Sequence, residues 1–243
     1  MDAIGDGSRP TAGLTAVMAD LHGNLIAVQT VLSEIAGLGV DSIVIAGDVA
    51  WGPQPAETIA LVRSLSIPVT IIQGNADREV AVPSSVAGDV FLRESTAWCA
   101  EQVGAAGRAW LAALQLTATF RVDGVGDVLV CHGSPRSDTD QIRPETDPAT
   151  LESWLAECSE PLVICGHTHL QFDRTAGRHR IVNPGSIGLH VGVDGAQWAL
   201  IGPGGVELRT TAYDRERAAA LTRTSGIPEA EGFAAFMLDP TRR

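Results

Sequence analysis

The sequence lacks the features that mark several common classes of protein. Its 243 residues contain no apolar run near the roughly 20 residues that a membrane-spanning helix needs. Residues 1–12 are rich in Gly, Asp, Ser and Pro and have no apolar segment of the kind that signal peptides carry. The four cysteines form no Cys-x-x-Cys pair, and Cys131 and Cys165 end apolar runs, where cysteine acts as a small buried side chain. We therefore expect a cytoplasmic protein with reduced thiols, no membrane partner and a flexible leader over residues 1–12.

Basic residues are scarce. The chain has 17 Lys and Arg against 29 Asp and Glu, a formal net charge of −12. Binding to extended nucleic acid depends on clusters of Lys and Arg, so this partner class is disfavoured. A small phosphorylated substrate is compatible with the charge, because bound metal ions can reverse the local potential.

No repeat, low-complexity block or linker divides the chain, which predicts a single domain over residues 13–243. In the first half, apolar runs alternate with helical patterns, which predicts βαβ units with right-handed crossovers and a largely parallel sheet. In the second half strands outnumber helices, although a helix is expected over residues 148–158 with Asp147 as its N-cap. The chain is therefore expected to have an α/β fold.

Five short polar signatures each follow directly after an apolar run that is expected to form a strand. The runs are residues 14–18, 43–46, 69–72, 128–131 and 162–165. The signatures are Asp20-Leu21-His22-Gly23-Asn24, Gly47-Asp48, Gly74-Asn75, His132-Gly133 and Gly166-His167-Thr168-His169. In an open α/β sheet, ligands gather beyond the carboxyl ends of the strands, so the five signatures are expected to converge.

The residue types in these signatures suit the binding of two divalent metal ions. Asp20 and His22 are alternate residues at an extended strand end, so their side chains point the same way and can share an ion. The carboxylate of Asp48 has two oxygens and can bridge two ions, and Asn75 adds a neutral oxygen. A set of Asp, Asn and His without a thiolate suits manganese, iron or zinc better than a structural zinc site.

The order Asp-x-His, Gly-Asp, Gly-Asn, His and Gly-His-x-His resembles that of the calcineurin-like metallophosphoesterase superfamily over about residues 14–189. The resemblance implies an α/β fold of two packed mixed β-sheets flanked by helices, a four-layer αββα sandwich. It also implies the role of each ligand. One ion would be held by Asp20, His22 and His169, the other by Asn75, His132 and His167, and Asp48 would bridge them.

Two details resemble the small bacterial and archaeal phosphodiesterase branch of that superfamily. Gly47-Asp48 continues as Val49-Ala50-Trp51, not as the Asp-Arg-Gly of the protein serine/threonine phosphatases and diadenosine tetraphosphatases. The chain also has a shortened Gly-Asn-x-Asp motif and a late Asn183-Pro184-Gly185-Ser186 segment. This resemblance implies a dinuclear phosphoesterase, favouring phosphodiesters, that uses in-line attack by a metal-bound hydroxide. Manganese is the favoured metal, with iron, zinc and nickel as alternatives.

The proton donor departs from the superfamily pattern. Many members have a histidine directly after the metal-binding asparagine, and this chain has Ala76. Asp77 is the nearest replacement acid, although a carboxyl needs a raised pKa to donate a proton near neutrality. His190 is the alternative donor. The expected catalytic residues are therefore Asp48 together with Asp77 or His190.

Three residues close to the ligands in sequence are candidates for binding substrate. The guanidinium groups of Arg78 and Arg136 match phosphate geometry, although solvated surface positions are the alternative. Asn24 either contacts the substrate phosphate or caps the following helix, and capping is the preferred interpretation. The sixth histidine, His179, is expected to be exposed in a hairpin.

The sequence leaves two other functions open. A phosphomonoesterase would use the same ligands, and a non-catalytic metal-binding scaffold would tolerate the loss of the histidine at position 76. The expected partner of the enzyme is a small phosphoester. Apolar residues around Leu111, or Phe233 and Phe236 near the C-terminus, either join copies in a homo-oligomer or close the core.

Overall fold

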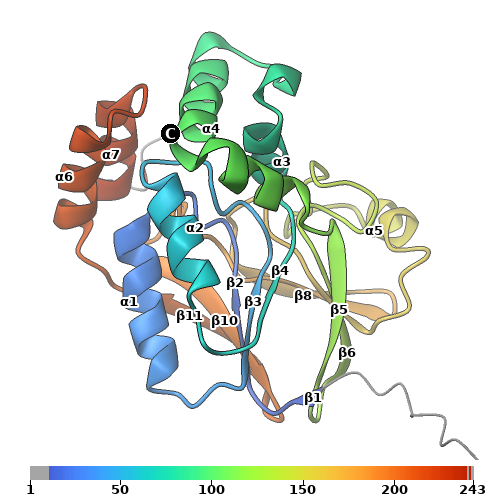
Figure 1. The fold of residues 1–243 in the computed structure, drawn as a ribbon. Helices are drawn as coiled ribbons and strands as arrows, with labels where there is room; N and C mark the ends of the chain where they lie inside the picture. The colour runs from blue at the N-terminus through green and yellow to red at the C-terminus, as the bar shows by residue number, and fades with distance from the viewer. Residues whose placement is uncertain (1–10, 240, 242–243) are drawn as a thin grey trace, which may run out of the picture.

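Two mixed β-sheets lie face to face in the computed structural model, which describes residues 11–239 and residue 241 (Figure 1). The five-stranded sheet has the order β11-β10-β2-β3-β4. Its strands are β2 (Thr15–Met18), β3 (Ser42–Ile45), β4 (Val69–Ile71), β10 (Ala196–Gly202) and β11 (Gly205–Thr211). The six-stranded sheet has the order β1-β5-β6-β7-β9-β8. Its strands are β1 (Thr11–Ala12), β5 (Thr117–Val122), β6 (Gly126–Cys131), β7 (Leu162–Ile164), β8 (Phe172–Ala176) and β9 (His179–Asn183).

Helices cover both outer faces of this pair of sheets. They are α1 (Leu25–Ala36), α2 (Pro55–Arg63), α3 (Asn75–Ala81), α4 (Val90–Ala112), α5 (Pro148–Trp154), α6 (Arg215–Ser225) and α7 (Ala230–Leu238), with a 3-10 turn at Pro83–Ser85. Figure 1 shows α1 and α2 beside the five-stranded sheet, α5 on the opposite side, and the α6–α7 hairpin beyond α1. Within the described residues, no helix is both long and apolar enough to cross a membrane.

Three clusters of buried apolar side chains hold these layers together. Successive side chains of a strand point to opposite faces, so Met18 belongs to the cluster that includes Val31 of α1, whereas its neighbour Val17 belongs to the cluster that includes Val130 of the other sheet. A third cluster, which includes Leu151, lies between the six-stranded sheet and α5. The predicted α/β fold of two packed mixed sheets flanked by helices is confirmed.

The parallel pairing predicted for the first half is confirmed for β2, β3 and β4. The sheet as a whole is mixed, because the late strand β10 pairs antiparallel with both β2 and β11. The five-stranded sheet therefore combines segments from both ends of the chain.

Several predicted boundaries differ from the structure. Residues 1–10 of the predicted leader lie outside the described residues, and its last two residues form β1, parallel to β5. Asp147 caps α5, as predicted, and accepts a hydrogen bond from the Thr150 N–H. The helix ends at Trp154, not at residue 158 as expected. Helix α3 was not predicted, because seven residues are too few to show a helical period.

Candidate metal centre

The loops after β2, β3, β4, β6 and β7 meet at one edge of the two sheets. Strands β2 to β4 run parallel, as do β6 and β7, so each set presents its carboxyl ends on one side. Two groups of side chains have their ligand atoms within 4.8 Å of one another. They are Asp20, His22 and His169, and Asp48, His132 and His167. The Oδ1 atom of Asn75 lies 3.1 Å from the Nε2 atom of His132. The structure thus brings together all seven side chains predicted to bind metal.

Backbone carbonyls orient three of these histidines. The Nδ1 atoms of His22, His132 and His169 lie 2.9, 2.8 and 2.7 Å from the carbonyl oxygens of Trp51, Ala46 and Leu189. A carbonyl oxygen only accepts hydrogen bonds, so each Nδ1 donates, and each Nε2 faces the cluster, where it can bind a metal ion once it is deprotonated. Metal-binding histidines are held in this way, with the second ring nitrogen bonded to a carbonyl or carboxylate.

The facing atoms would repel one another without a proton or a metal ion between them. His22 Nε2 and His169 Nε2 are 3.0 Å apart, and His132 Nε2 lies 3.3 Å from Asp48 Oδ2. Burial lowers the pKa of His22 to about 4, and repulsion from His169 adds to the shift. Burial opposes a charge on His132, but the carboxylate of Asp48 outweighs it and raises the pKa of His132 to about 10. A bound cation would displace the proton of His132, so the donor set fits divalent metal ions.

Backbone strain is concentrated at these ligands. Six non-glycine residues in the described part of the chain have a positive φ. Five of them are Asp20, His22, Asp48, His167 and His169, with φ of 53°, 44°, 54°, 67° and 58°. Such conformations cost roughly 1–3 kcal/mol each and cluster at functional sites. The fold therefore holds these side chains in place at the expense of local backbone stability.

The Asn183-Pro184-Gly185-Ser186 segment supports the ligand loops from behind. The Asn183 amide donates to the carbonyl of Gly166, at 2.7 Å, and the Ser186 hydroxyl donates to the carbonyl of Asp20, at 2.9 Å. Both side chains are fully buried. The segment is therefore part of the loop scaffold.

Asp77 lies behind the ligand cluster, and this position contradicts its predicted role as proton donor. It is fully buried, and its two carboxylate oxygens accept hydrogen bonds from the N–H groups of Val49, Ala50 and Gly74 at 2.9, 3.0 and 3.1 Å. Burial and the charge of Asp48 raise the pKa of Asp77, and the backbone donors oppose that rise. A general acid has to reach the leaving atom, and this carboxylate instead ties the loop after β3 to the loop after β4.

His190 and Asn24 are also turned away from the cavity over the cluster. His190 is 1% exposed, and its Nε2 atom lies 3.0 Å from the Tyr213 hydroxyl. The Asn24 side chain accepts from the Ala27 N–H and donates to the Gly188 carbonyl and to Tyr213. The helix-capping interpretation of Asn24 is confirmed, and its complete burial leaves no atom open to a substrate.

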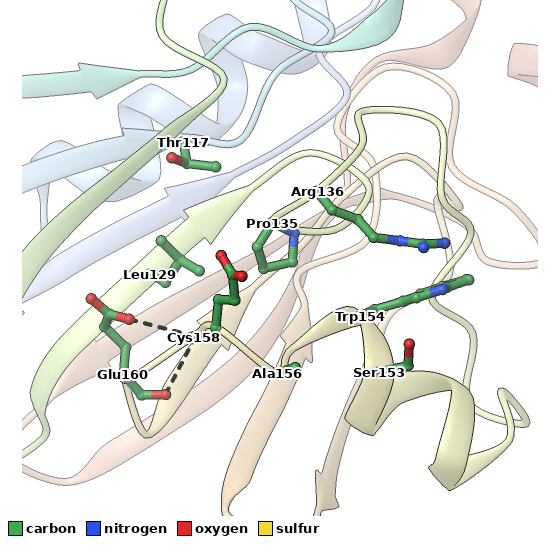
Figure 2. A pocket seen from close by; sticks show the side chains of 10 residues that line it. Thr117, Leu129, Pro135, Arg136, Ser153, Trp154, Ala156, Cys158 and Glu160 are labelled. Carbon is green, nitrogen blue, oxygen red and sulfur yellow. Dashed lines mark hydrogen bonds between the residues drawn. The ribbon is translucent and has the colours of Figure 1, made fainter.

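The two arginines do not line the cavity over the ligands either. Arg78 donates to Asp138 at 2.7 Å. Arg136 pairs with Asp140, and its guanidinium lies 5.0 Å from the ring of Trp154. Figure 2 shows Arg136 and Trp154 stacked on the wall of a different cavity of about 500 Å³, which none of the seven candidate ligands lines. The prediction that His179 is exposed is wrong: the residue is 5% exposed, and its Nδ1 lies 2.9 Å from the carbonyl oxygen of Glu160.

The sequence reasoning missed Glu79, which lines the cavity of about 230 Å³ over the ligands together with Trp51, Ala76 and Leu189. Glu79 lies four residues after Asn75 in α3, so the two side chains share one helix face. Burial raises the pKa of Glu79, and the charge of Arg78 opposes the shift. The i, i+4 spacing would have identified it, had α3 been predicted.

Comparisons with known proteins agree with this geometry. The sequence of residues 14–202 matches the calcineurin-like phosphoesterase superfamily domain. The uncharacterised protein MJ0912 of Methanocaldococcus jannaschii is 26% identical over 199 residues, which cover 79% of this chain and 76% of that protein. A metallophosphoesterase from Sphaerobacter thermophilus superposes with a TM-score of 0.76 at 25% identity, covering 95% of this chain and 100% of that chain. The hypothetical protein PH1004 from Pyrococcus horikoshii shares the fold, with a TM-score of 0.82 at 21% identity, and the match covers 92% and 97% of the two chains.

Superfamily membership implies divalent metal ions, and the described residues include two groups able to hold them. The match covers more than half of the chain and spans all five ligand loops. The chain belongs to the calcineurin-like phosphoesterase superfamily.

Proposed function

We propose that this protein is a dinuclear metal-dependent phosphodiesterase. The observation that carries the proposal is the convergence of seven Asp, Asn and His side chains with their potential ligand atoms facing one another. Asp48 is the proposed bridge, because its Oδ2 atom lies 3.7 Å from His22 Nε2 and 3.3 Å from His132 Nε2. Its other oxygen accepts the N–H of Ala76 at 2.9 Å, which holds the carboxylate between the two groups.

The charge of the cavity favours a diester over a monoester. A diester carries one negative charge near neutrality, whereas a monoester carries close to two. The cavity is lined by the carboxyl group of Glu79, while Arg78 is engaged by Asp138. Both esters would meet the charge of the metal ions, but the second charge of a monoester would also face an acidic side chain without a compensating arginine.

The residues at the cavity also predict which leaving groups are preferred. When bound, the two ions would supply activated water and offset the charge that develops at phosphorus. Ala76 offers no proton at the position of the superfamily histidine, and Asp77 is buried behind it. We expect fast hydrolysis of esters whose leaving group is stable as an anion, such as an aryl oxide. Manganese is the proposed metal, with iron, zinc and nickel as alternatives.

The test compares bis-p-nitrophenyl phosphate with p-nitrophenyl phosphate. Metal-stripped protein is reloaded with manganese and assayed as wild type, Asp48→Asn and His132→Ala. Arg136→Ala is the matched control, because Arg136 lines the separate cavity. We expect turnover that depends on manganese, favours the diester and is lost in the first two variants only.

Two other outcomes would reject the proposal in different ways. Preference for the monoester would indicate a phosphomonoesterase that uses the same ligands. Absence of turnover with two metal ions bound per chain would indicate a non-catalytic scaffold.

A further inference from the structure

An apolar hollow of about 260 Å³ adjoins the cavity over the candidate ligands. It is lined by Trp51, Phe91, His169, Leu189, Phe233 and Phe236. Trp51, His169 and Leu189 also line the cavity that contains the ligands, so the two spaces are contiguous. A substrate bound at the ligand cluster could therefore extend past His169 into the apolar hollow.

Aromatic rings from three separate parts of the chain build the hollow. Trp51 lies three residues after Asp48, Phe91 is in the first turn of α4, and Phe233 lies in α7. The ring centroids of Trp51 and Phe233 are 5.3 Å apart, and those of Phe91 and Phe233 are 5.8 Å apart. These separations are typical of packed aromatic pairs, so the rings support one another and present a formed surface.

The hollow leaves apolar surface for a ligand to bury. Trp51, Phe91, Leu189 and Phe236 are only half-buried, although each lines the hollow. The indole N–H of Trp51 donates to the hydroxyl of Thr96, at 3.2 Å, so the polar edge of this ring is already bonded. Covering the remaining apolar surface is favourable, at roughly 25 cal/mol per Å².

A second observation marks the hollow as more than a gap in packing. Glu229 lines it and has a φ of 56° at the start of α7. It is the sixth non-glycine residue with a positive φ in the described part of the chain, and the other five are candidate metal ligands. This strained residue is the N-cap of the helix that carries Phe233 and Phe236. Backbone strain therefore occurs at the hollow as well as at the ligand cluster.

We propose that the apolar hollow binds an aromatic group of the phosphoester substrate while the phosphoryl group lies on the ligand cluster. The inference rests on the proposed phosphoesterase function and adds the substrate class to it. A cavity of about 150 Å³ is enough to hold benzene, so this hollow accommodates one substituted ring. Apart from His169 and Glu229, the side chains that line the hollow are apolar, so a second anionic group would find few partners there, which argues against a polyphosphate chain.

Binding of two phosphinates, which carry one negative charge like a diester and have no ester bond to hydrolyse, tests this assignment. Methyl(phenyl)phosphinate and dimethylphosphinate are titrated calorimetrically into manganese-loaded protein. Partial burial of the ring predicts roughly tenfold tighter binding of methyl(phenyl)phosphinate, equivalent to about 1.4 kcal/mol. In Phe236→Ala and Phe91→Ala the ratio falls below about threefold, while the affinity for dimethylphosphinate stays unchanged and reports an intact ligand cluster. Leu221→Ala is the matched control, because Leu221 is exposed on α6 and does not line the hollow.

Kinetics supply an independent readout with one leaving group throughout. The wild type is expected to give a higher kcat/KM for phenyl p-nitrophenyl phosphate than for methyl p-nitrophenyl phosphate, and Phe236→Ala is expected to reduce that ratio. Equal affinities and equal kcat/KM values in the wild type, or ratios unchanged in both phenylalanine variants, would overturn the aromatic subsite while leaving the phosphoesterase intact. Failure to bind either phosphinate and to hydrolyse either ester would reject the phosphoesterase proposal itself.

Discussion

Replacement of Asp77 distinguishes between two roles for its carboxylate, structural support and proton donation. The carboxylate is fully buried and accepts three backbone N–H groups, from Val49, Ala50 and Gly74. In Asp77→Ala all three donors lose their partner. In Asp77→Asn one oxygen still accepts from Val49 and Ala50, but the amide nitrogen then faces the N–H of Gly74, donor against donor.

The magnitudes follow from the number of orphaned donors. A buried donor without a partner costs about 1–3 kcal/mol. Asp77→Asn should therefore lower the free energy of unfolding by about 1–3 kcal/mol, and Asp77→Ala by at least about 3 kcal/mol. Domains of this kind are stable by only about 5–15 kcal/mol, so the alanine variant should be close to the limit of folding.

Urea unfolding of the metal-free variants measures the stability, and a series of diesters with increasingly basic leaving groups measures the chemistry. We expect the order wild type, Asp77→Asn, Asp77→Ala in stability. The folded fraction of Asp77→Asn should show the same dependence on the leaving group as the wild type. An Asp77→Asn protein of unchanged stability that loses activity selectively toward basic leaving groups would refute the structural role and restore Asp77 as the acid.

Three further perturbations test the remaining features of the site. Chelation of the metals should lower Tm, and manganese at 100 times its Kd should restore about 2.7 kcal/mol of stability for each ion bound by mass action, measured by thermal unfolding. Gly74→Ala should lower kcat/KM by roughly 100-fold, because its Cβ would lie 2.1 Å from Asp48 Oδ1 and displace that carboxylate; Gly204→Ala, whose Cβ meets nothing within 4 Å, is the control. Arg136→Ala should leave kcat and KM unchanged and lower the unfolding free energy by less than about 1 kcal/mol, since its ion pair and ring contact are exposed. Full activity in Gly74→Ala, a raised KM in Arg136→Ala, or a Tm indifferent to manganese would contradict the site as described.

The candidate ligands could be predicted because their pattern is linear. Each of the five signatures follows an apolar run, and the carboxyl ends of parallel strands meet at one edge. Residue types with specific coordination chemistry, in a fixed order, were therefore sufficient to identify Asp20, Asp48 and their partners before any contact was known. The two packed mixed sheets were implied only by the resemblance of that pattern to a known superfamily.

Closeness in sequence to a ligand was misleading for the other roles. Asp77 and Glu79 lie two and four residues after Asn75 in α3. A residue two positions along a helix points away from the first, whereas one four positions along shares its face. Asp77 therefore lies behind the loops and Glu79 lines the cavity. Without the short helix α3, neither direction could be predicted.

The amino-acid sequence therefore decided the chemical identity of the site, because metal ligation depends on residue types and on strand-end positions that a linear pattern records. Tertiary structure alone decided which neighbours face that site. The pairing of His190 with Tyr213, the stacking of Arg136 on Trp154 and the presence of Phe236 and His169 in the lining of one hollow all join segments that are not adjacent in sequence. Such contacts depend on how the layers pack, and no local spacing encodes them.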